Sequence, residues 1–189
     1  MVQMNKYTKV WKGGYMGENC KIQESKRNLD FKYVSKNTID YLSLHDCFCT
    51  KFYYQDNRLV FEMEWMEVLA NHPQNPYNKA HQSGISKIEL INPKYLSMNK
   101  GKYGTWDTLI PIEYNSIEEI NNNSSTINIS ETIDILNFDE IKRSNEYCLY
   151  VYANYWKNKD YDAIEMKMVY EESIISFNNL ENESWFEDE

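Results

Sequence analysis

The stretch that decides the fold is LHDCFCTKFYYQDNRLVFEMEWM, residues 44–66. In its second half, apolar and polar side chains alternate with a period of two, which is typical of a half-buried β-strand. Between the two halves, QDNR at residues 55–58 supplies residues that favour tight turns. The stretch therefore predicts a β-hairpin with strands near 47–54 and 59–66. Its second strand has an apolar face of Leu59, Phe61, Met63 and Trp65, and an opposite face of Val60, Glu62 and Glu64.

The first strand of this hairpin should supply the matching apolar face. Residues two apart on a strand point to the same side of the sheet. Strict alternation through residues 47–54 therefore places Phe48, Phe52 and Tyr54 on one face, with Thr50 between them.

A second hairpin is predicted near the C-terminal end, from strands at 147–156 and 163–170 joined by the polar turn KNKDYD. Its second strand again alternates between two kinds of side chain. Two amphipathic hairpins predict an antiparallel sheet. The side chains expected on one face are Ile164, Met166, Met168 and Tyr170, and those on the other are Glu165 and Lys167.

The rest of the chain predicts short elements. Strands are expected at 7–11, 20–24, 29–34 and 85–91, a loop at 70–84, a turn-rich segment at 92–105 and an exposed loop at 121–126. A capping-box pattern predicts a short helix at 116–121, a helical turn is expected at 138–144, and Trp185 and Phe186 are expected to pack back onto the sheet. The fold class is mainly β, with a β-rich α+β fold as a variant: antiparallel sheets built from hairpins as a sandwich or half-barrel, with one to three short helices. Residues 1–189 are expected to form a single domain.

Composition restricts the partners and the compartment. The chain has 189 residues and a formal net charge of −9, so its surface repels nucleic acid and anionic membranes, and a basic protein is its electrostatic complement. No apolar run has the length of a signal peptide or a membrane span, which predicts a cytoplasmic protein with no membrane association. Its four cysteines are expected to remain thiols there. The sequence leaves the oligomeric state open.

One set of side chains has the chemistry of a metal site or of a Cys/His hydrolase: His45, Cys47, Cys49, His72 and His81. On an extended strand, however, residues i and i+2 lie ~6.6 to 6.8 Å apart. Two thiolates on one zinc ion lie under ~4 Å apart. The spacing therefore argues against a metal site, and acidic surroundings disfavour a reactive thiolate. We expect no metal and no cofactor. A metal-dependent or Cys/His hydrolase remains the alternative enzyme hypothesis.

Four other residues are the candidates for binding. Glu62 and Glu64 share the solvent face of a predicted strand, and Tyr150 and Tyr152 share one face of another. Tyrosine is enriched in recognition surfaces because its ring offers apolar area and a polar tip. These residues predict a protein-binding surface. The alternatives are that the tyrosines serve general sheet packing and that the glutamates only mark a half-exposed strand. The aromatic content keeps a carbohydrate-binding β-sandwich as a further alternative.

Two short motifs carry a resemblance. Leu44-His45-Asp46 before the first hairpin, and Trp185-Phe186-Glu187 near the end of the chain, resemble small uncharacterised bacterial families with an LHD hairpin and a C-terminal W-[FY]-E. Some of these families are similar to immunity proteins of polymorphic toxin systems. The resemblance implies a cytoplasmic, non-catalytic, β-rich protein whose partner is a toxin domain, and it implies no catalytic residues.

Overall fold

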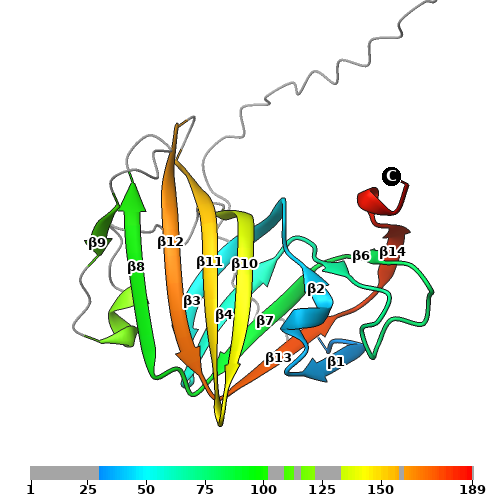
Figure 1. The fold of residues 1–189 in the computed structure, drawn as a ribbon, viewed down its shortest axis with the longest axis horizontal. Coiled ribbons are helices and arrows are strands. Elements are labelled where there is room, and N and C mark those ends of the chain that lie inside the picture. The colour runs from blue at the N-terminus through cyan, green and yellow to red at the C-terminus, as the bar shows by residue number, and fades with distance from the viewer. Residues whose placement is uncertain (1–29, 102–108, 113–115, 122–132, 158–159, 189) are drawn as a thin grey trace, which may run out of the picture.

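The computed structural model describes residues 30–101, 109–112, 116–121, 133–157 and 160–188. It is mainly β, as the sequence predicts, and its described strands form two antiparallel sheets that do not close into a barrel. Figure 1 shows β8, β12, β11 and β10 running side by side, with β3, β4 and β7 crossing diagonally behind them. The sheet is therefore strongly bent.

The larger sheet has ten strands and the smaller has four. In spatial order the larger sheet contains β1 (Tyr33–Lys36), β13 (Glu172–Phe177), β7 (Ser86–Ile91), β4 (Arg58–Met63), β3 (Cys47–Gln55), β10 (Ile133–Arg143), β11 (Glu146–Lys157), β12 (Asp160–Tyr170), β8 (Tyr95–Gly101) and β9 (Ile110–Ile112). The smaller contains β14 (Leu180–Glu183), β6 (His81–Ser83), β5 (Glu67–Val68) and β2 (Leu42–Ser43). Three 3-10 turns, η1 (Ile39–Tyr41), η3 (Ile117–Asn121) and η4 (Trp185–Asp188), complete the described elements.

The first predicted hairpin is present as β3 and β4. Gln55 pairs with Arg58, so the turn is two residues long, shorter than the predicted connection. Both turn residues, Asp56 and Asn57, have positive φ, at 49° and 59°. This backbone is typical of a type I′ turn, which Asp and Asn tolerate. The predicted apolar face is confirmed for Leu59, Phe61 and Met63, which are all buried.

The prediction for the first strand of the hairpin is wrong at Phe48. A β-bulge lies between Cys49 and Lys51, where Thr50 is the additional residue. The bulge changes the phase of the alternation, so Cys47 and Cys49 enter the core ahead of it and Phe52 enters after it. Phe48 is only partly buried and packs edge-on against Trp65, with ring centroids 5.2 Å apart.

The bend in the larger sheet lies where β3 meets β10. These two strands pair only at Cys47–Cys49 with Ile133–Ile135, and β10 carries a second bulge between Ile135 and Asn137. Bulges increase local twist and turn corners in sheets. The two halves of the sheet therefore pack on one another, and a single core cluster contains residues from both halves, together with Ile39 of η1 and Ile120 of η3.

The second predicted hairpin is β11 and β12, in register from Tyr147 with Tyr170 to Lys157 with Asp160. Its face prediction is confirmed, because Ile164, Met166, Met168 and Tyr170 each have 0% exposure. Residues 158–159 at its turn lie outside the described residues.

The smaller sheet continues strands of the larger one. The chain passes from β4 to β5, from β6 to β7 and from β13 to β14 with only a few residues between them. The order β14-β6-β5 therefore repeats the order β13-β7-β4. β6 lies within the predicted 70–84 loop, so that loop is shorter than expected.

Four other local predictions need correction. β8 occupies half of the segment expected to be turn-rich, and β10 covers all but the last residue of the expected helical turn at 138–144. The expected helix at 116–121 is the 3-10 turn η3. Trp185 is exposed and contacts the neighbouring Phe186. The strands predicted at 7–11 and 20–24, and residues 122–126 of the predicted loop, lie outside the described residues.

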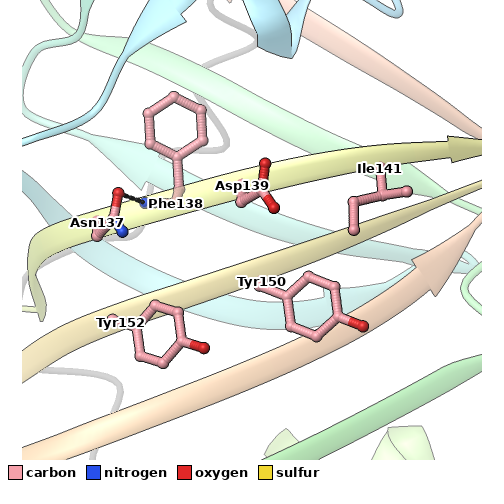
Figure 2. Close-up of a pocket in the computed structure, with 6 residues that line it drawn as sticks. All are labelled: Asn137, Phe138, Asp139, Ile141, Tyr150 and Tyr152. Atoms are coloured by element: carbon pink, nitrogen blue, oxygen red, sulfur yellow. Dashed lines mark hydrogen bonds between the residues drawn. The ribbon is translucent and has the colours of Figure 1, made fainter.

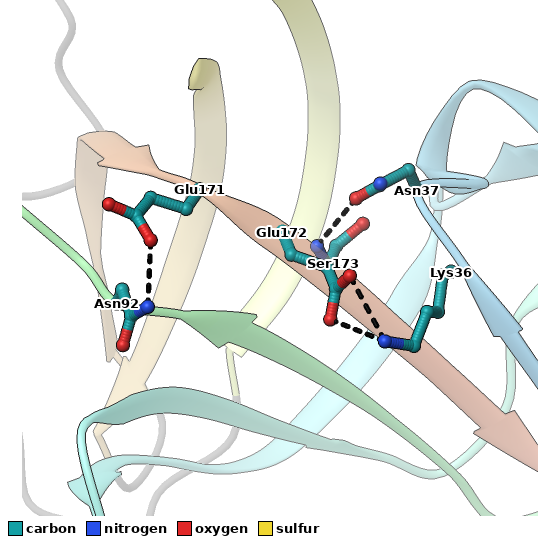
Figure 3. Close-up of polar contacts among 6 residues, drawn as sticks. All are labelled: Lys36, Asn37, Asn92, Glu171, Glu172 and Ser173. Atoms are coloured by element: carbon teal, nitrogen blue, oxygen red, sulfur yellow. Dashed lines mark hydrogen bonds and ion pairs between the residues drawn. The ribbon is translucent and has the colours of Figure 1, made fainter. Parts of the chain in front are cut away.

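Polar side chains form hydrogen bonds and an ion pair between β13 and the ends of its two neighbouring strands, β1 and β7 (Figure 3). Lys36 Nζ donates to both carboxylate oxygens of Glu172, at 2.9 and 3.1 Å. Asn37, at a φ of 53°, accepts the Ser173 amide on its side-chain oxygen at 2.9 Å. On the other side Asn92 donates to Glu171 at 2.7 Å. These contacts fix the register of β13 against β1 and β7.

Candidate functional site

The outer face of β10, β11, β12 and β8, which points away from the core, presents tyrosines in cross-strand rows. In the first row Asn137 pairs with Tyr152, which pairs with Glu165, which pairs with Asn99. Asn99 donates to Glu165 at 2.7 Å, and the Tyr152 hydroxyl is also hydrogen-bonded to Glu165. Partial desolvation, and next the charge of Glu165, raise the pKa of Tyr152. The hydrogen bond to Glu165 fixes the Tyr152 hydroxyl on the β12 side.

In the second row Asp139 pairs with Tyr150, and Tyr150 pairs with Lys167. The Lys167 ammonium lies 5.4 Å from the centre of the Tyr150 ring and 5.9 Å from that of Tyr95. Both distances are within the range of cation–π attraction. Tyr150 thus already holds one cation on its β12 side, and its β10 side faces a carboxylate.

The two rows enclose a shallow groove of about 510 Å³ between β10 and β11. Figure 2 shows Tyr150 and Tyr152 side by side along β11, with Asn137, Asp139 and Ile141 along β10. We call this the tyrosine groove. It is lined by Asn137, Phe138, Asp139, Ile141, Tyr150 and Tyr152.

Further aromatic side chains extend this exposed face. Trp156 and Tyr161 are cross-strand partners on β11 and β12, with ring centroids 5.0 Å apart. Tyr95 on β8 is 49% exposed and Ile141 on β10 is 42% exposed. Apolar and aromatic side chains gathered on one exposed face are typical of an interaction surface.

The four predicted binding residues separate into two places. Tyr150 and Tyr152 both line the groove. Glu62 lies on β4, where Lys51 Nζ approaches it at 3.3 Å and the Tyr53 hydroxyl donates to it at 3.0 Å. Glu64 is exposed just after β4. Neither glutamate lines the groove, so the structure does not bring them together with the two tyrosines.

The two hairpin cysteines lie in the core. Cys47 and Cys49 both have 0% exposure. Burial raises the pKa of each thiol to about 12, and the charge of Glu67 adds to this at Cys47 and that of Glu62 at Cys49. Both are therefore neutral thiols at physiological pH, whereas nucleophilic attack and metal binding need the thiolate.

His45 is exposed at the entrance of the same hairpin. Its Nδ1 lies 2.5 Å from the Leu136 carbonyl oxygen, at the second bulge, and its Nε2 lies 3.5 Å from Asp46. These contacts anchor the corner between β3 and β10.

His72 is buried beside two hydroxyl groups. Its Nε2 lies 3.2 Å from Ser35 Oγ and 3.3 Å from Thr38 Oγ1. Its Nδ1 accepts the Gln74 backbone amide at 3.1 Å, so in the neutral ring Nε2 carries the proton and donates to these hydroxyls. In that tautomer His72 does not act as a base toward Ser35.

The acid stability of the protein should depend on His72. Burial lowers its pKa to about 4 from an ordinary value of 6.5, so between these values the unfolded chain binds more protons and stability falls as pH falls. In His72→Gln, the decrease in the free energy of unfolding between pH 7 and pH 4 should be about 2 kcal/mol smaller than in the wild type, allowing for solvent screening. Urea unfolding at pH 7 and pH 4 measures it. Ser35→Ala should instead lower stability equally at both pH values, and an unchanged acid loss in H72Q would contradict the assignment.

His81, the remaining member of the predicted set, lies on β6. Its ring stacks on Tyr77 with centroids 4.1 Å apart, and its Nδ1 lies 3.1 Å from the Lys79 carbonyl oxygen. Among the described residues, no group of three or more His, Cys, Asp or Glu side chains is arranged to hold a metal ion.

Glu140 is an ionisable residue that the sequence did not single out. It lies on the core-facing side of β10, opposite Leu149, and the Tyr170 hydroxyl donates a short hydrogen bond to it. Burial raises the pKa of Glu140 to about 7, with a further contribution from the negative charge of Asp40. The sequence signal was weak because Glu140 falls in a segment that lacks clear alternation.

Stability should also decrease at high pH through Glu140. The pKa of Glu140 in the folded protein, about 7, exceeds the ordinary value of 4.5. The stabilisation that protonated Glu140 gives to the folded state is therefore complete below pH 4.5 and is lost as pH rises through 7. Glu140→Gln should therefore be more stable than the wild type at pH 8, by about 2 kcal/mol with screening, and similar at pH 4.5. Asp40→Asn should lower the titration midpoint of Glu140 in carboxyl-detected NMR. Equal destabilisation by E140Q at both pH values would show that charge plays no part.

No known protein family, curated protein or solved structure matches this chain in comparisons of sequence and fold. In the part of the chain that the structure describes, no helix has the length and apolar character needed to cross a membrane.

Proposed function

We propose that this protein is a non-catalytic protein-binding module that contacts its partner through the tyrosine groove and the aromatic face around it. The observation that carries the proposal is the groove itself, in which Tyr150 and Tyr152 lie beside polar and apolar side chains of β10. Tyrosine rings bind with little loss of conformational freedom, because only two torsions must be fixed.

The charge of the chain favours a basic partner. The formal net charge is −9, and Asp139 and Glu165 lie in the two rows of the groove. Opposite charge on a partner accelerates encounter and selects among partners. A toxin domain of the kind bound by the immunity proteins that the sequence resembles would have this character.

We propose that the protein is cytoplasmic. Cys47, Cys49 and Cys148 are free and buried in the structure, which suits a reducing compartment. The neutral state of the two hairpin thiols and the tautomer of His72 favour binding over Cys/His hydrolysis.

The proposal is tested by affinity purification from the source organism, with three forms of the protein as bait. The wild type should retain a stoichiometric companion, and Tyr150→Ser with Tyr152→Ser should lose it. Glu62→Gln with Glu64→Gln is the matched double variant outside the groove and should retain more of the companion than the tyrosine variant. Equal retention by both double variants would contradict the groove as the contact surface.

A carbohydrate ligand is a second candidate, because the half-buried rings of Tyr150 and Tyr152 beside Asn137 and Asp139 offer both stacking surfaces and hydrogen-bonding groups for a sugar. Glycan-array binding that is lost in the Tyr150 and Tyr152 double variant would support this candidate. No binding to any glycan on the array would exclude this candidate.

A further inference from the structure

The tyrosine groove contains a carboxylate, that of Asp139, to which no described side chain binds. Asp139 is exposed and forms no hydrogen bond or ion pair within the described residues. Most other carboxylates on the larger sheet are engaged: Glu62 with Lys51, Glu89 with Arg58, and Glu165 with Asn99. Asp139 is therefore an exposed acidic group of this face that remains available to an incoming cation.

The neighbours of Asp139 suit a flat cation. Tyr150 is its direct cross-strand partner, so the carboxylate and the ring side chain begin roughly 5 Å apart at their Cβ atoms. Tyr152 lies two residues along the same strand and lines the same groove. A guanidinium can stack on an aromatic ring while it donates two hydrogen bonds to a carboxylate, because it is planar and weakly hydrated.

The chain's own cation approaches Tyr150 from the strand on the opposite side to Asp139. Lys167, which lies 5.4 Å from the Tyr150 ring centre, comes from β12. Asp139 comes from β10, on the other side of β11. Ile141, 42% exposed and two residues beyond Asp139, provides an apolar surface against which the methylene stem of an arginine can pack.

We infer that the tyrosine groove is an arginine-binding site, in which Asp139 pairs with the guanidinium of a basic partner and Tyr150 and Tyr152 stack on it. The inference rests on the proposed function and specifies the chemistry of the partner: a protein segment that presents an exposed arginine. A groove of about 510 Å³ also has room for the residues that flank this arginine in the partner.

Amide NMR with short probes tests the inference on the full chain. The blocked tripeptide Ac-Gly-Arg-Gly-NH2 should shift the amide signals of residues 137–141 and 150–152 in a saturable manner. The lysine peptide should bind several-fold more weakly, since an ammonium lacks the planar fork. The citrulline peptide, which keeps the shape and lacks the charge, should bind about tenfold more weakly.

Two variants connect the binding to the groove. Asp139→Asn, a change of nearly equal shape at an exposed position, should weaken arginine binding about tenfold, and its amide spectrum reports whether it remains folded. Glu62→Gln, at a carboxylate outside the groove, should leave the affinity within about twofold. Equal binding of the arginine and citrulline peptides, shifts spread over the surface, or equal weakening by D139N and E62Q would each overturn the inference.

Failure here can be told apart from failure of the proposed function. If the tyrosine double variant loses its protein companion while the arginine peptide does not bind, the groove is a contact surface that does not select arginine. If the peptide binds but the tyrosine double variant retains as much companion as the wild type, the arginine site is supported and the proposed protein-binding role is contradicted.

Discussion

Replacing Ile164 by lysine should abolish folding. Ile164 has 0% exposure at the centre of β12 and belongs to the common core cluster. A lysine there would bury a charge without a partner, which costs several kcal/mol even when the group loses its proton. That is of the order of the whole stability of a domain of this size, about 5 to 15 kcal/mol. Circular dichroism and the chemical-shift dispersion of Ile164→Lys measure the loss directly.

The neighbouring residue is the matched control, because it receives the same substitution on the opposite face. Glu165 points outward and bonds Asn99 and Tyr152, so Glu165→Lys should remain folded and lose about 1 kcal/mol. A folded I164K variant, or an unfolded E165K variant, would show that the face assignment of the second hairpin is incorrect.

The second large effect is expected at Phe61. It is buried on β4 and packs against Phe52, with ring centroids 4.5 Å apart. Truncation to alanine removes the ring and leaves a cavity between the two halves of the sheet, which typically costs about 3 to 5 kcal/mol. Urea unfolding of Phe61→Ala should therefore show a much lower midpoint with a similar slope.

Phe48 is the control for this variant because the bulge at Thr50 keeps it out of the core. Its ring packs on Trp65 at 5.2 Å and is only partly buried. Phe48→Ala should cost about 1 to 2 kcal/mol, from lost aromatic contact and a smaller buried area. A loss as large as that of F61A would place Phe48 in the core, as strict alternation predicts, and would contradict the bulge.

The hairpins could be predicted because their side chains alternate over long runs. Leu59, Phe61 and Met63 in β4, and Ile164, Met166 and Met168 in β12, all enter the core as the pattern indicates. Alternation reports which face a residue occupies only while the backbone stays regular. One additional residue at Thr50 was therefore enough to make the prediction for Phe48 wrong.

Other elements could not be predicted because long-range pairing forms them. β8 has the sequence YLSMNKG, whose serine, asparagine and lysine have low strand propensity, and it is a strand because it pairs with β12 and β9. The strands of the smaller sheet are two to four residues long, too short for a periodic signal. β10 carries carboxylates on both faces, Asp139 outward and Glu140 inward, so apolar and polar side chains do not alternate clearly along it.

The β11 side of the candidate site could be predicted from the sequence, and the β10 side could not. Tyr150 and Tyr152 share a face because they are two residues apart on a strand, and this was evident from the sequence. Asp139 and Ile141 fall in the segment for which the sequence predicts a helical turn, and Asn137 lies just before it. Only the pairing of β10 with β11 places all three beside the tyrosines. Alternation predicts only that Glu62 and Glu64 share a solvent face, which says nothing about their distance from the groove.

Site-specific photo-crosslinking tests the central claim, that the tyrosine groove contacts a protein partner. A photoreactive phenylalanine derivative replaces Tyr152 in one variant and Tyr77 in a second. Tyr77 is an exposed tyrosine on the loop before β6. After irradiation in cells of the source organism, position 152 should yield one adduct of defined mass, and adding Asp139→Asn to that variant should reduce its yield. Position 77 should yield none. Equal adducts from both positions, or no adduct from position 152, would contradict the account.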